Sequence, residues 1–278
     1  MKNFISLAVS CIMGVFMFSI SPMQVSAEEI CFADDGFNGS SFIRTEQEII
    51  NYAYKTETED YISCSLPKYG EGSSRPNTCA NIAGATLLGY YDKTYDEMIP
   101  NFTAGRTIRD KYIFNAKTSA VQDVIDDLYI RMATNTTGNG TTANNCRNGL
   151  ASYINSKGRN VTYTNVVSGG TINYSLYDQA VNNETPMILF VSGYTLLKLG
   201  DFTESATQDV LNMSLYGGTH TVVAYGRKNI KYYNASNQLI REENFLRVAT
   251  GYSTSPLVYI MVDGVVGEFI EGNIVAIS

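Results

Sequence analysis

The chain has 278 residues, of which 44% are hydrophobic, and it carries a formal net charge of −7 and a single histidine, His220. This length and apolar content suffice for one large domain or two small ones with a buried core. The acidic balance argues against nucleic acid or an anionic membrane as the main partner. Because only one imidazole is present, an HExxH metalloprotease pair and a three-histidine zinc site are both excluded, and we expect neither a metal nor a cofactor.

Residues 1–27 have the pattern of a secretory signal peptide. Lys2 provides a short positive start, an apolar stretch continues to Ile20, and small residues end at Ala27, after which we expect cleavage. The alternative is an uncleaved membrane anchor, which Pro22 and the cleavage site disfavour. We therefore predict a secreted, extracellular protein, in solution or associated with the cell surface, with no stable membrane insertion after cleavage.

Four cysteines remain after this cleavage: Cys31, Cys64, Cys79 and Cys146. In a secreted chain they permit two disulfides, or one disulfide together with a working thiol. A bridge between Cys31 and Cys64 would fasten the N-terminal segment, but the spacing establishes no pairing. The sequence around each cysteine must therefore decide its role.

Residues 28–75 are polar and rich in turn-forming residues, and the sequence predicts one helix in them, over Glu46–Tyr54. This N-terminal segment is either a prosegment or part of the domain. Residues 76–278 are predicted to form the main domain, since neither an internal repeat nor a long linker divides them.

Three helices are predicted in the first part of the main domain. An uncharged stretch of small residues runs from Cys79 to Tyr91, and we expect a helix there that is buried nearly all round. A capping-box pattern begins a second helix over Ser119–Met132, with apolar residues on one face. A third helix continues to Lys157 and ends at Gly158, because glycine favours helix termini.

After Gly158 the apolar residues alternate as they do in strands, apart from one short predicted helix over Tyr174–Asn182. The strands are predicted over Val161–Val167, Met187–Ser192, His220–Gly226, Phe245–Thr250, Leu257–Val262 and Val265–Ile270. Helices first and strands of the antiparallel type afterwards indicate one α+β domain.

Cys79 lies in the first turn of the first predicted helix. Asn77 or Thr78 can cap the helix there, and Pro76 keeps the preceding chain extended. The unpaired main-chain amides and the dipole at a helix N-terminus favour a thiolate and lower the pKa of a cysteine. The position therefore suits a nucleophile, and an ordinary buried or disulfide-bonded cysteine is the alternative.

His220 follows two glycines at the start of a predicted strand, where another segment can approach closely. A turn over Asn234–Asn237 would fold the next segment back and place Gly251 opposite His220. Without a bulge, the residue that orients the imidazole would then come from Thr250 to Tyr252. A histidine in this position is a candidate general base, and a satisfied core histidine is the alternative.

Three segments, taken in order, resemble secreted bacterial papain-like cysteine peptidases, and in particular the branch similar to bacteriocin-processing peptidases. They are NTCANIAGATLLGYYD from Asn77, the stretch from Gly140 to Gly158, and GGTHTVVAYG from Gly217. The resemblance implies an α+β, papain-like fold. In that fold N-terminal helices, one of them buried and carrying the cysteine, pack on a C-terminal antiparallel β-sheet.

The same resemblance implies a chemistry. Cys79 would be the nucleophile, and His220 the general base and then acid, in the hydrolysis of a peptide or protein substrate. Two positions depart from the family pattern: Thr250 stands where relatives usually have Asn or Asp, and no Gln lies in the region several residues before Cys79 where the family has one to hold the oxyanion. Asn77 is the nearest amide for that second role.

These observations predict a secreted cysteine peptidase. Two alternatives stay open. One is a papain-like module that binds peptides or proteins with weak or no catalysis, which both departures favour. The other is a thiol hydrolase or acyltransferase that acts on cell-wall peptides.

Overall fold

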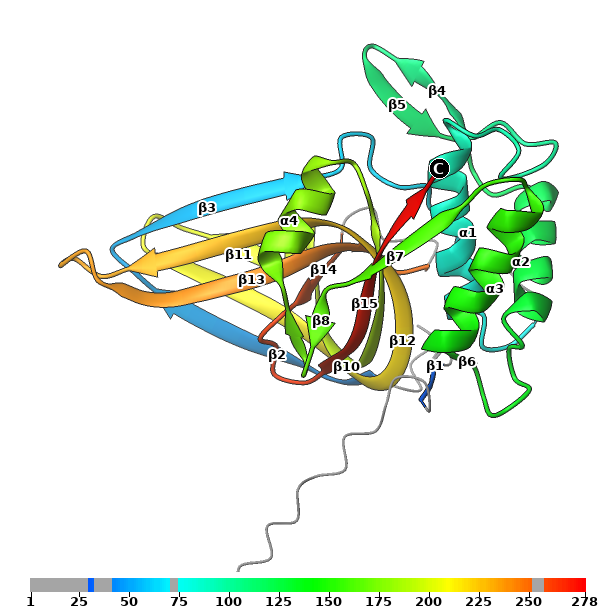
Figure 1. Cartoon of the computed structure of the whole chain (residues 1–278). Helices are drawn as coiled ribbons and strands as arrows, with labels where there is room; N and C mark the ends of the chain where they lie inside the picture. Colours follow the sequence, from blue (N-terminus) through cyan, green and yellow to red (C-terminus); the bar gives the residue numbers. More distant parts are fainter. Residues whose placement is uncertain (1–29, 33–41, 71–74, 252–257) are drawn as a thin grey trace, which may run out of the picture.

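The computed structural model describes residues 30–32, 42–70, 75–251 and 258–278, and the predicted signal peptide lies outside these residues. Of the described residues, 45% are in strands and 23% in helices. The predicted papain-like arrangement, with helices packed on a C-terminal sheet, is wrong. Most of the molecule is instead one large antiparallel sheet, which extends far beyond the helices (Figure 1).

The large sheet has nine strands, and its pairings are antiparallel. They are β2 (Phe42–Asn51), β3 (Tyr54–Tyr61), β7 (Val161–Asn165), β10 (Met187–Lys198), β11 (Phe202–Glu204), β12 (Gln208–Tyr233), β13 (Leu239–Ala249), β14 (Val258–Met261) and β15 (Glu268–Ile277). The longest, β12, pairs with β2, β3, β10, β11 and β13 along its length. Because β10 pairs with both β12 and β14, the strands β10, β12, β13 and β14 close a ring of hydrogen-bonded neighbours.

Three small sheets of two strands each complete the β-structure. They pair β1 (Cys31–Phe32) with β6 (Thr141–Thr142), β4 (Gly105–Ile108) with β5 (Lys111–Phe114), and β8 (Val167–Ser168) with β9 (Thr171–Ile172). One turn of 3₁₀ helix, η1 (Leu199–Asp201), joins β10 to β11.

The helix predicted over Glu46–Tyr54 is wrong, because this stretch belongs to β2 and β3. Exposure alternates along β2, so that Ile50 is buried whereas Ile49 is exposed. Arg241 of β13 donates two hydrogen bonds to the Glu48 carboxylate, of 2.5 and 2.7 Å, from a position 193 residues further along the chain. Such distant partners override the local helix propensity of a Glu- and Gln-rich segment.

Helices α1 (Cys79–Asp92), α2 (Ser119–Arg131) and α3 (Ala143–Ser156) form a layer at one end of the molecule (Figure 1). Helix α4 (Tyr174–Asn182) lies on the other face of the sheet. Its Tyr177 packs with Leu189, whereas the α1 layer packs with Ile188 and Phe190 of the same strand, and successive side chains of a strand point to opposite faces. The four helices predicted in this region are confirmed to within about two residues at each end.

Helix α1 is buried almost all round, as its sequence predicts, since every residue in it except Tyr91 is buried. At Gly89 a Cβ atom would come within 2.4 Å of the Tyr69 ring, so only glycine lets that ring lie against the helix. No helix among the described residues is long and apolar enough to cross a membrane.

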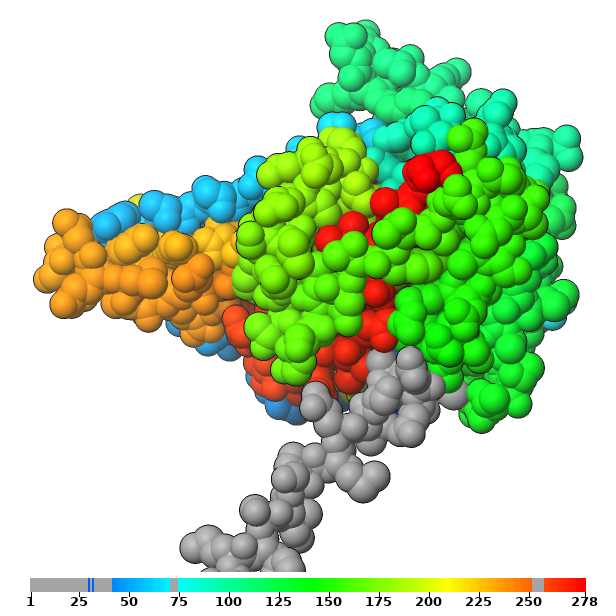
Figure 2. Space-filling view, in the orientation of Figure 1, coloured from blue at the N-terminus to red at the C-terminus, as the bar shows by residue number. Residues whose placement is uncertain are grey.

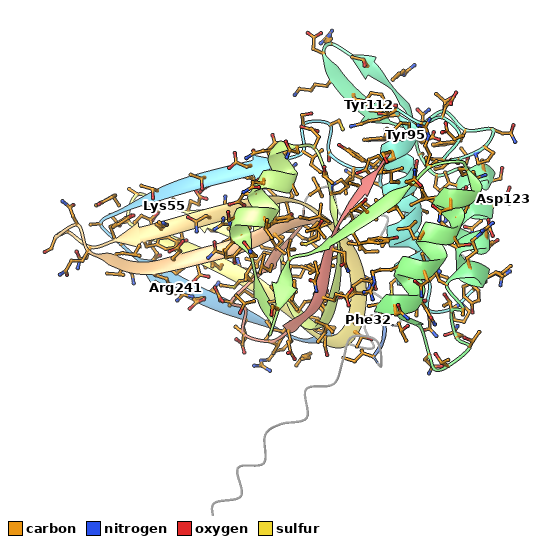
Figure 3. The ribbon with its side chains drawn as sticks, viewed as in Figure 1. Phe32, Lys55, Tyr95, Tyr112, Asp123 and Arg241 are labelled. Carbon is orange, nitrogen blue, oxygen red and sulfur yellow. The ribbon has the colours of Figure 1, made fainter. Side chains whose placement is uncertain are left out.

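The part of the sheet farthest from α1–α3, built from β2, β3, β11 and the adjoining ends of β12 and β13, is here called the β-lobe. It projects as an arm (Figure 2), with Lys55 and Arg241 on it (Figure 3). Inside it Asp209 is only 2% exposed and accepts hydrogen bonds from Tyr52 at 2.7 Å, Lys55 at 2.7 Å and Tyr232 at 3.0 Å. The hydrogen bonds from these three donors offset the free-energy cost of removing the carboxylate from water.

Candidate functional site

Cys79 is the first residue of α1, as predicted, and its side chain is buried. Its Sγ lies 3.6 Å from the main-chain carbonyl oxygen of Phe32, to which the thiol donates. Phe32 belongs to β1 and is fully buried, with its ring 4.9 Å from the ring of Phe190 on β10. The short strand β1 therefore covers the thiol in this structure.

A second buried thiol, Cys146 on α3, lies close to Cys79. Burial raises the pKa of Cys146 well above its ordinary value, and negative charge on Cys79 raises it further. Cys146 is therefore held as a neutral thiol. Cys64 and Cys146 are both free thiols, so the Cys31–Cys64 bridge considered from the sequence is not formed.

His220 lies on β12 opposite Val191 of β10, and only 1% of its surface is exposed. Its ring stacks on Tyr194, with the ring centroids 5.8 Å apart. Its Nε2 atom lies 2.9 Å from the main-chain carbonyl oxygen of Thr250. Because a carbonyl oxygen only accepts hydrogen bonds, Nε2 is the donor in this contact.

The structure brings Thr250 to His220, at the position where the sequence placed an orienting residue, but through the main chain and not the hydroxyl. The predicted register is wrong by one residue, because Val223 pairs with Ala249. The difference arises at the turn, where Tyr233 pairs with Leu239 and not with Gln238, because the two later irregularities in the β12–β13 pairing cancel.

His220 lies beside a gap in the pairing of β12. On the side of β12 away from β10, the described pairing with β2 ends at Tyr216 and the pairing with β13 begins at Val223. The chain at Thr250 passes this gap, and α1 lies beyond it. His220 shares its face of the sheet with Val191, which belongs to the core on the α4 side. His220 therefore projects from the α4 face of the sheet, and the Thr250 carbonyl that its ring contacts is the link to the segment that touches α1.

Gly251 connects this edge to the helix that carries Cys79. It has a φ of +80°, and a Cβ atom built on it would lie 3.1 Å from Cγ2 of Ile82. Ile82 follows Cys79 by three residues, which is about one helical turn. Cys79 on α1 and His220 on β12 are thus linked through Ile82, Gly251 and the carbonyl of Thr250.

Asn77, the predicted oxyanion donor, has a different role in this structure. Its side-chain amide donates to Oδ1 of Asn135 at 2.8 Å, and the same oxygen accepts from the amide of Gly140 at 2.6 Å. Asn77 therefore fastens the loop that follows α2. Main-chain amides of the first turn of α1 remain as donors for an oxyanion at Cys79.

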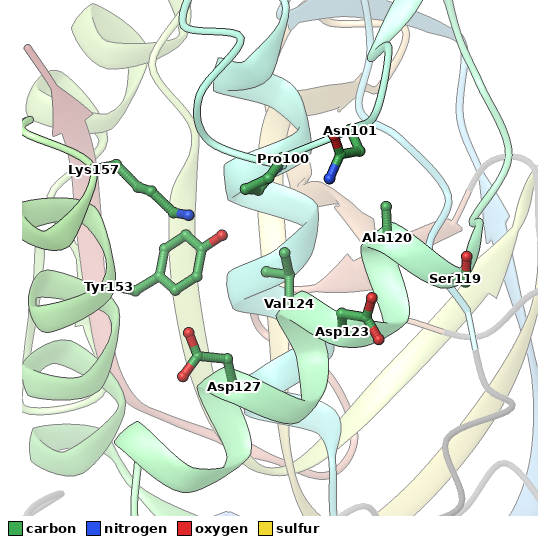
Figure 4. Close-up of a pocket in the computed structure, with 9 residues that line it drawn as sticks. All are labelled: Pro100, Asn101, Ser119, Ala120, Asp123, Val124, Asp127, Tyr153 and Lys157. Atoms are coloured by element: carbon green, nitrogen blue, oxygen red, sulfur yellow. The ribbon is translucent and has the colours of Figure 1, made fainter.

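A surface cavity of about 400 Å³ lies between α2, α3 and the loop at Pro100 (Figure 4). Asp123, Asp127, Tyr153 and Lys157 line it, and its lining includes neither Cys79 nor His220. The cavity is therefore separate from the candidate site.

Sequence reasoning missed Phe32 and Tyr194, which contact Cys79 and His220 respectively. Their contacts depend on pairings between distant segments, and no local motif signals them. No protein-family model, no curated protein and no solved structure matches this chain.

Proposed function

We propose that this protein is a cysteine peptidase in which Cys79 attacks the scissile carbonyl and His220 transfers the protons. One observation carries the proposal: the Thr250 carbonyl binds Nε2 of His220, and the next residue, Gly251, packs on α1 one turn from Cys79. This contact orients the ring and makes Nδ1 the basic nitrogen, which a general base near a thiol requires.

The reaction follows from these roles. Nδ1 of His220 takes the proton from Cys79, and the sulfur attacks the carbonyl carbon of the substrate. Main-chain amides at the start of α1 stabilise the oxyanion. The imidazolium then protonates the leaving amine, the C–N bond breaks, and a thioester remains on Cys79. A water molecule, deprotonated by Nδ1, releases the acyl group as a carboxylic acid.

Catalysis by this route requires β1 to move. Cys79 is 3% exposed, and the carbonyl of Phe32 occupies the position beside the sulfur that a substrate carbonyl must take. Among the described residues two pairs join β1 to β6, so the main-chain hydrogen bonds of these two residues are a small obstacle to its displacement. Burial of the Phe32 ring against Phe190 is the larger obstacle.

A peptide-binding module without catalysis is the second candidate, and the same covered thiol favours it. In such a module Cys79 and His220 would be buried structural residues. The two candidates differ in one measurable property, which is whether the reactivity of Cys79 depends on His220.

The experiment measures alkylation of Cys79 by iodoacetamide near neutral pH, with peptide mapping, in the wild type, His220→Ala and Cys79→Ser. We expect labelling of Cys79 to be at least about tenfold slower in His220→Ala, and labelling of Cys146 to stay unchanged as an internal control. Cleavage of a fluorogenic casein should fall about a thousandfold or more in both variants. Equal labelling of Cys79 with and without His220, or cleavage that survives in Cys79→Ser, would overturn the proposal.

A further inference from the structure

Cys64 is a second thiol in an environment unlike that of Cys79 or Cys146. It lies in the loop between β3 and α1 and is partly exposed, whereas the other two are buried. It also borders a cavity, so a reagent from solvent can reach it.

The sulfur of Cys64 faces a positive charge. Nζ of Lys93, the residue that follows α1, lies 3.0 Å from Sγ and donates to it. An ammonium group only donates hydrogen bonds, so the sulfur is the acceptor in this contact. A nearby ammonium group favours the thiolate form of a cysteine over the thiol. Among the described residues no carboxylate lies within ion-pair distance of Lys93, so no acidic side chain competes with the sulfur for the ammonium group.

Tyr90 holds Lys93 in this position. The ammonium lies 3.8 Å from the centroid of the Tyr90 ring, in a cation–π contact, and the Tyr90 hydroxyl donates to the carbonyl of Glu184 at 2.6 Å. Burial, and next the negative charge on Cys64, raise the pKa of Tyr90 above its ordinary value. The phenol therefore stays neutral and contacts Lys93 through the face of its ring.

The cavity beside Cys64 has a volume of about 390 Å³ and a lining suited to an anion with an apolar body. Tyr112 and Phe114 of β5 supply aromatic walls, and Lys68 supplies a second positive charge. Among the described residues that line the cavity there is no carboxylate. Tyr112 lies on the projecting β4–β5 hairpin (Figure 3).

We propose that Cys64 is a site of S-thiolation that takes small anionic disulfides. The Cys64 thiolate attacks one sulfur of the disulfide, its S–S bond breaks, and a new S–S bond forms to Cys64. The other half leaves as a thiolate with the electron pair, so Cys64 is oxidised and the leaving half is reduced. Lys93 stabilises the attacking thiolate, and Lys68 attracts the anionic group of the reagent. The proposal is independent of any activity at Cys79.

The test uses dithiobis(nitrobenzoic acid), an anionic aromatic disulfide, on the full chain, with the released thiolate followed by absorbance and the modified cysteine identified by mass spectrometry. We expect a fast phase of one thiol that maps to Cys64, is absent in Cys64→Ser, and slows about tenfold in Lys93→Met. Lys93→Arg retains the charge and should keep most of the rate. The fast phase should also persist in Cys79→Ser, so its outcome is distinct from that of the peptidase proposal.

A neutral disulfide, dithiodipyridine, provides the matched control for charge selection. Lys68→Met should slow the anionic reagent about threefold or more and leave the neutral one unchanged. A fast phase that survives in Cys64→Ser, or a Cys64 that reacts in Lys93→Met as fast as in the wild type, would overturn the proposal. Equal effects of Lys68→Met on both reagents would overturn the preference for anions. Thermal melts of each variant establish that it is folded.

Discussion

The imidazole of His220 is held 2.9 Å from the main-chain carbonyl oxygen of Thr250, an acceptor that any residue at position 250 would supply. The backbone path past the end of β13 therefore supplies the partner of Nε2. The threonine at this position is thus compatible with an oriented imidazole, because its hydroxyl is not what binds the ring.

A substitution at position 250 distinguishes the contribution of the Thr250 carbonyl from that of the Thr250 hydroxyl. Thr250→Val keeps the carbonyl and the volume of the side chain but removes the hydroxyl. We expect the His220-dependent labelling rate of Cys79 to stay within about threefold of the wild type, since the lost hydroxyl does not bind Nε2. A loss as large as that in His220→Ala would show that the hydroxyl matters.

We expect substitution of Gly251 to destabilise the protein for two reasons, backbone strain and a close contact. The same substitution at Gly158 measures the effect of backbone strain alone. Both have a left-handed backbone, with φ of +80° and +77°, but a Cβ atom at Gly158 meets open space whereas one at Gly251 lies 3.1 Å from Ile82. Gly158→Ala should lower the free energy of unfolding by about 1 kcal/mol through backbone strain alone. Gly251→Ala should cost about 1 kcal/mol more, as measured by urea unfolding, through the added contact. Equal losses in the two variants would mean that the contact with Ile82 is relieved at no cost.

The buried carboxylate of Asp209 is expected to dominate the stability of the β-lobe. Asp209→Asn replaces an acceptor of three hydrogen bonds by a group with its own donors and leaves Lys55 without its buried partner, so we expect a loss of about 3 kcal/mol. Glu204 pairs with the same Lys55 at 3.1 Å but is exposed, and Glu204→Gln should change stability by no more than about 0.5 kcal/mol. Comparable losses in the two variants, measured by thermal and urea unfolding, would contradict this account.

Asp92 makes the stability of the protein depend on pH, with a sign opposite to that expected for a salt-bridged carboxylate. Burial first, and next the neighbouring carboxylates Asp96 and Glu97, raise the pKa of Asp92 from 3.8 to about 6, although the amide of Ile99 opposes the change. The folded state holds this proton more tightly than the unfolded state. The contribution to stability is therefore present below about pH 4 and is lost as pH rises through about 6.

Asp92→Asn tests this sign, because the amide oxygen still accepts from Ile99 and cannot ionise. The stability of the variant relative to the wild type should improve by about 1 kcal/mol between pH 4 and pH 7, as measured by urea unfolding at both. A relative stability that does not change with pH, or that worsens as pH rises, would rule out a raised pKa at Asp92.

Local features of the sequence predicted the helices well. Helix α4 runs over the predicted Tyr174–Asn182, with Asn173 capping it, and α3 ends before Gly158. The position of Cys79 at the start of a buried helix followed in the same way from the small, uncharged residues around it. Each of these features depends on contacts within a few residues, which composition and periodicity record directly.

The sheet and half of the candidate site could not be predicted in this way. Glu48 and Arg241 are 193 residues apart in the chain. The alternation of polar and apolar residues around Glu48 does not identify the distant strand with which this segment pairs. The cover of Phe32 over Cys79 depends on a pairing of two residues with β6. The contact of Lys93 with Cys64 depends on how the loop after β3 returns to the end of α1. All three are decided by the tertiary arrangement, which overrides local preference.

The pairings of β12 have a consequence for the order of events during folding. This one strand takes partners from as early as Phe42 and as late as Ala249, so its full set of pairings cannot form before Ala249 has been synthesised. The carbonyl of Thr250 is supplied at the very end of that series. A nascent chain can therefore form α1, with Cys79 in it, before the segment that binds the His220 ring has been synthesised.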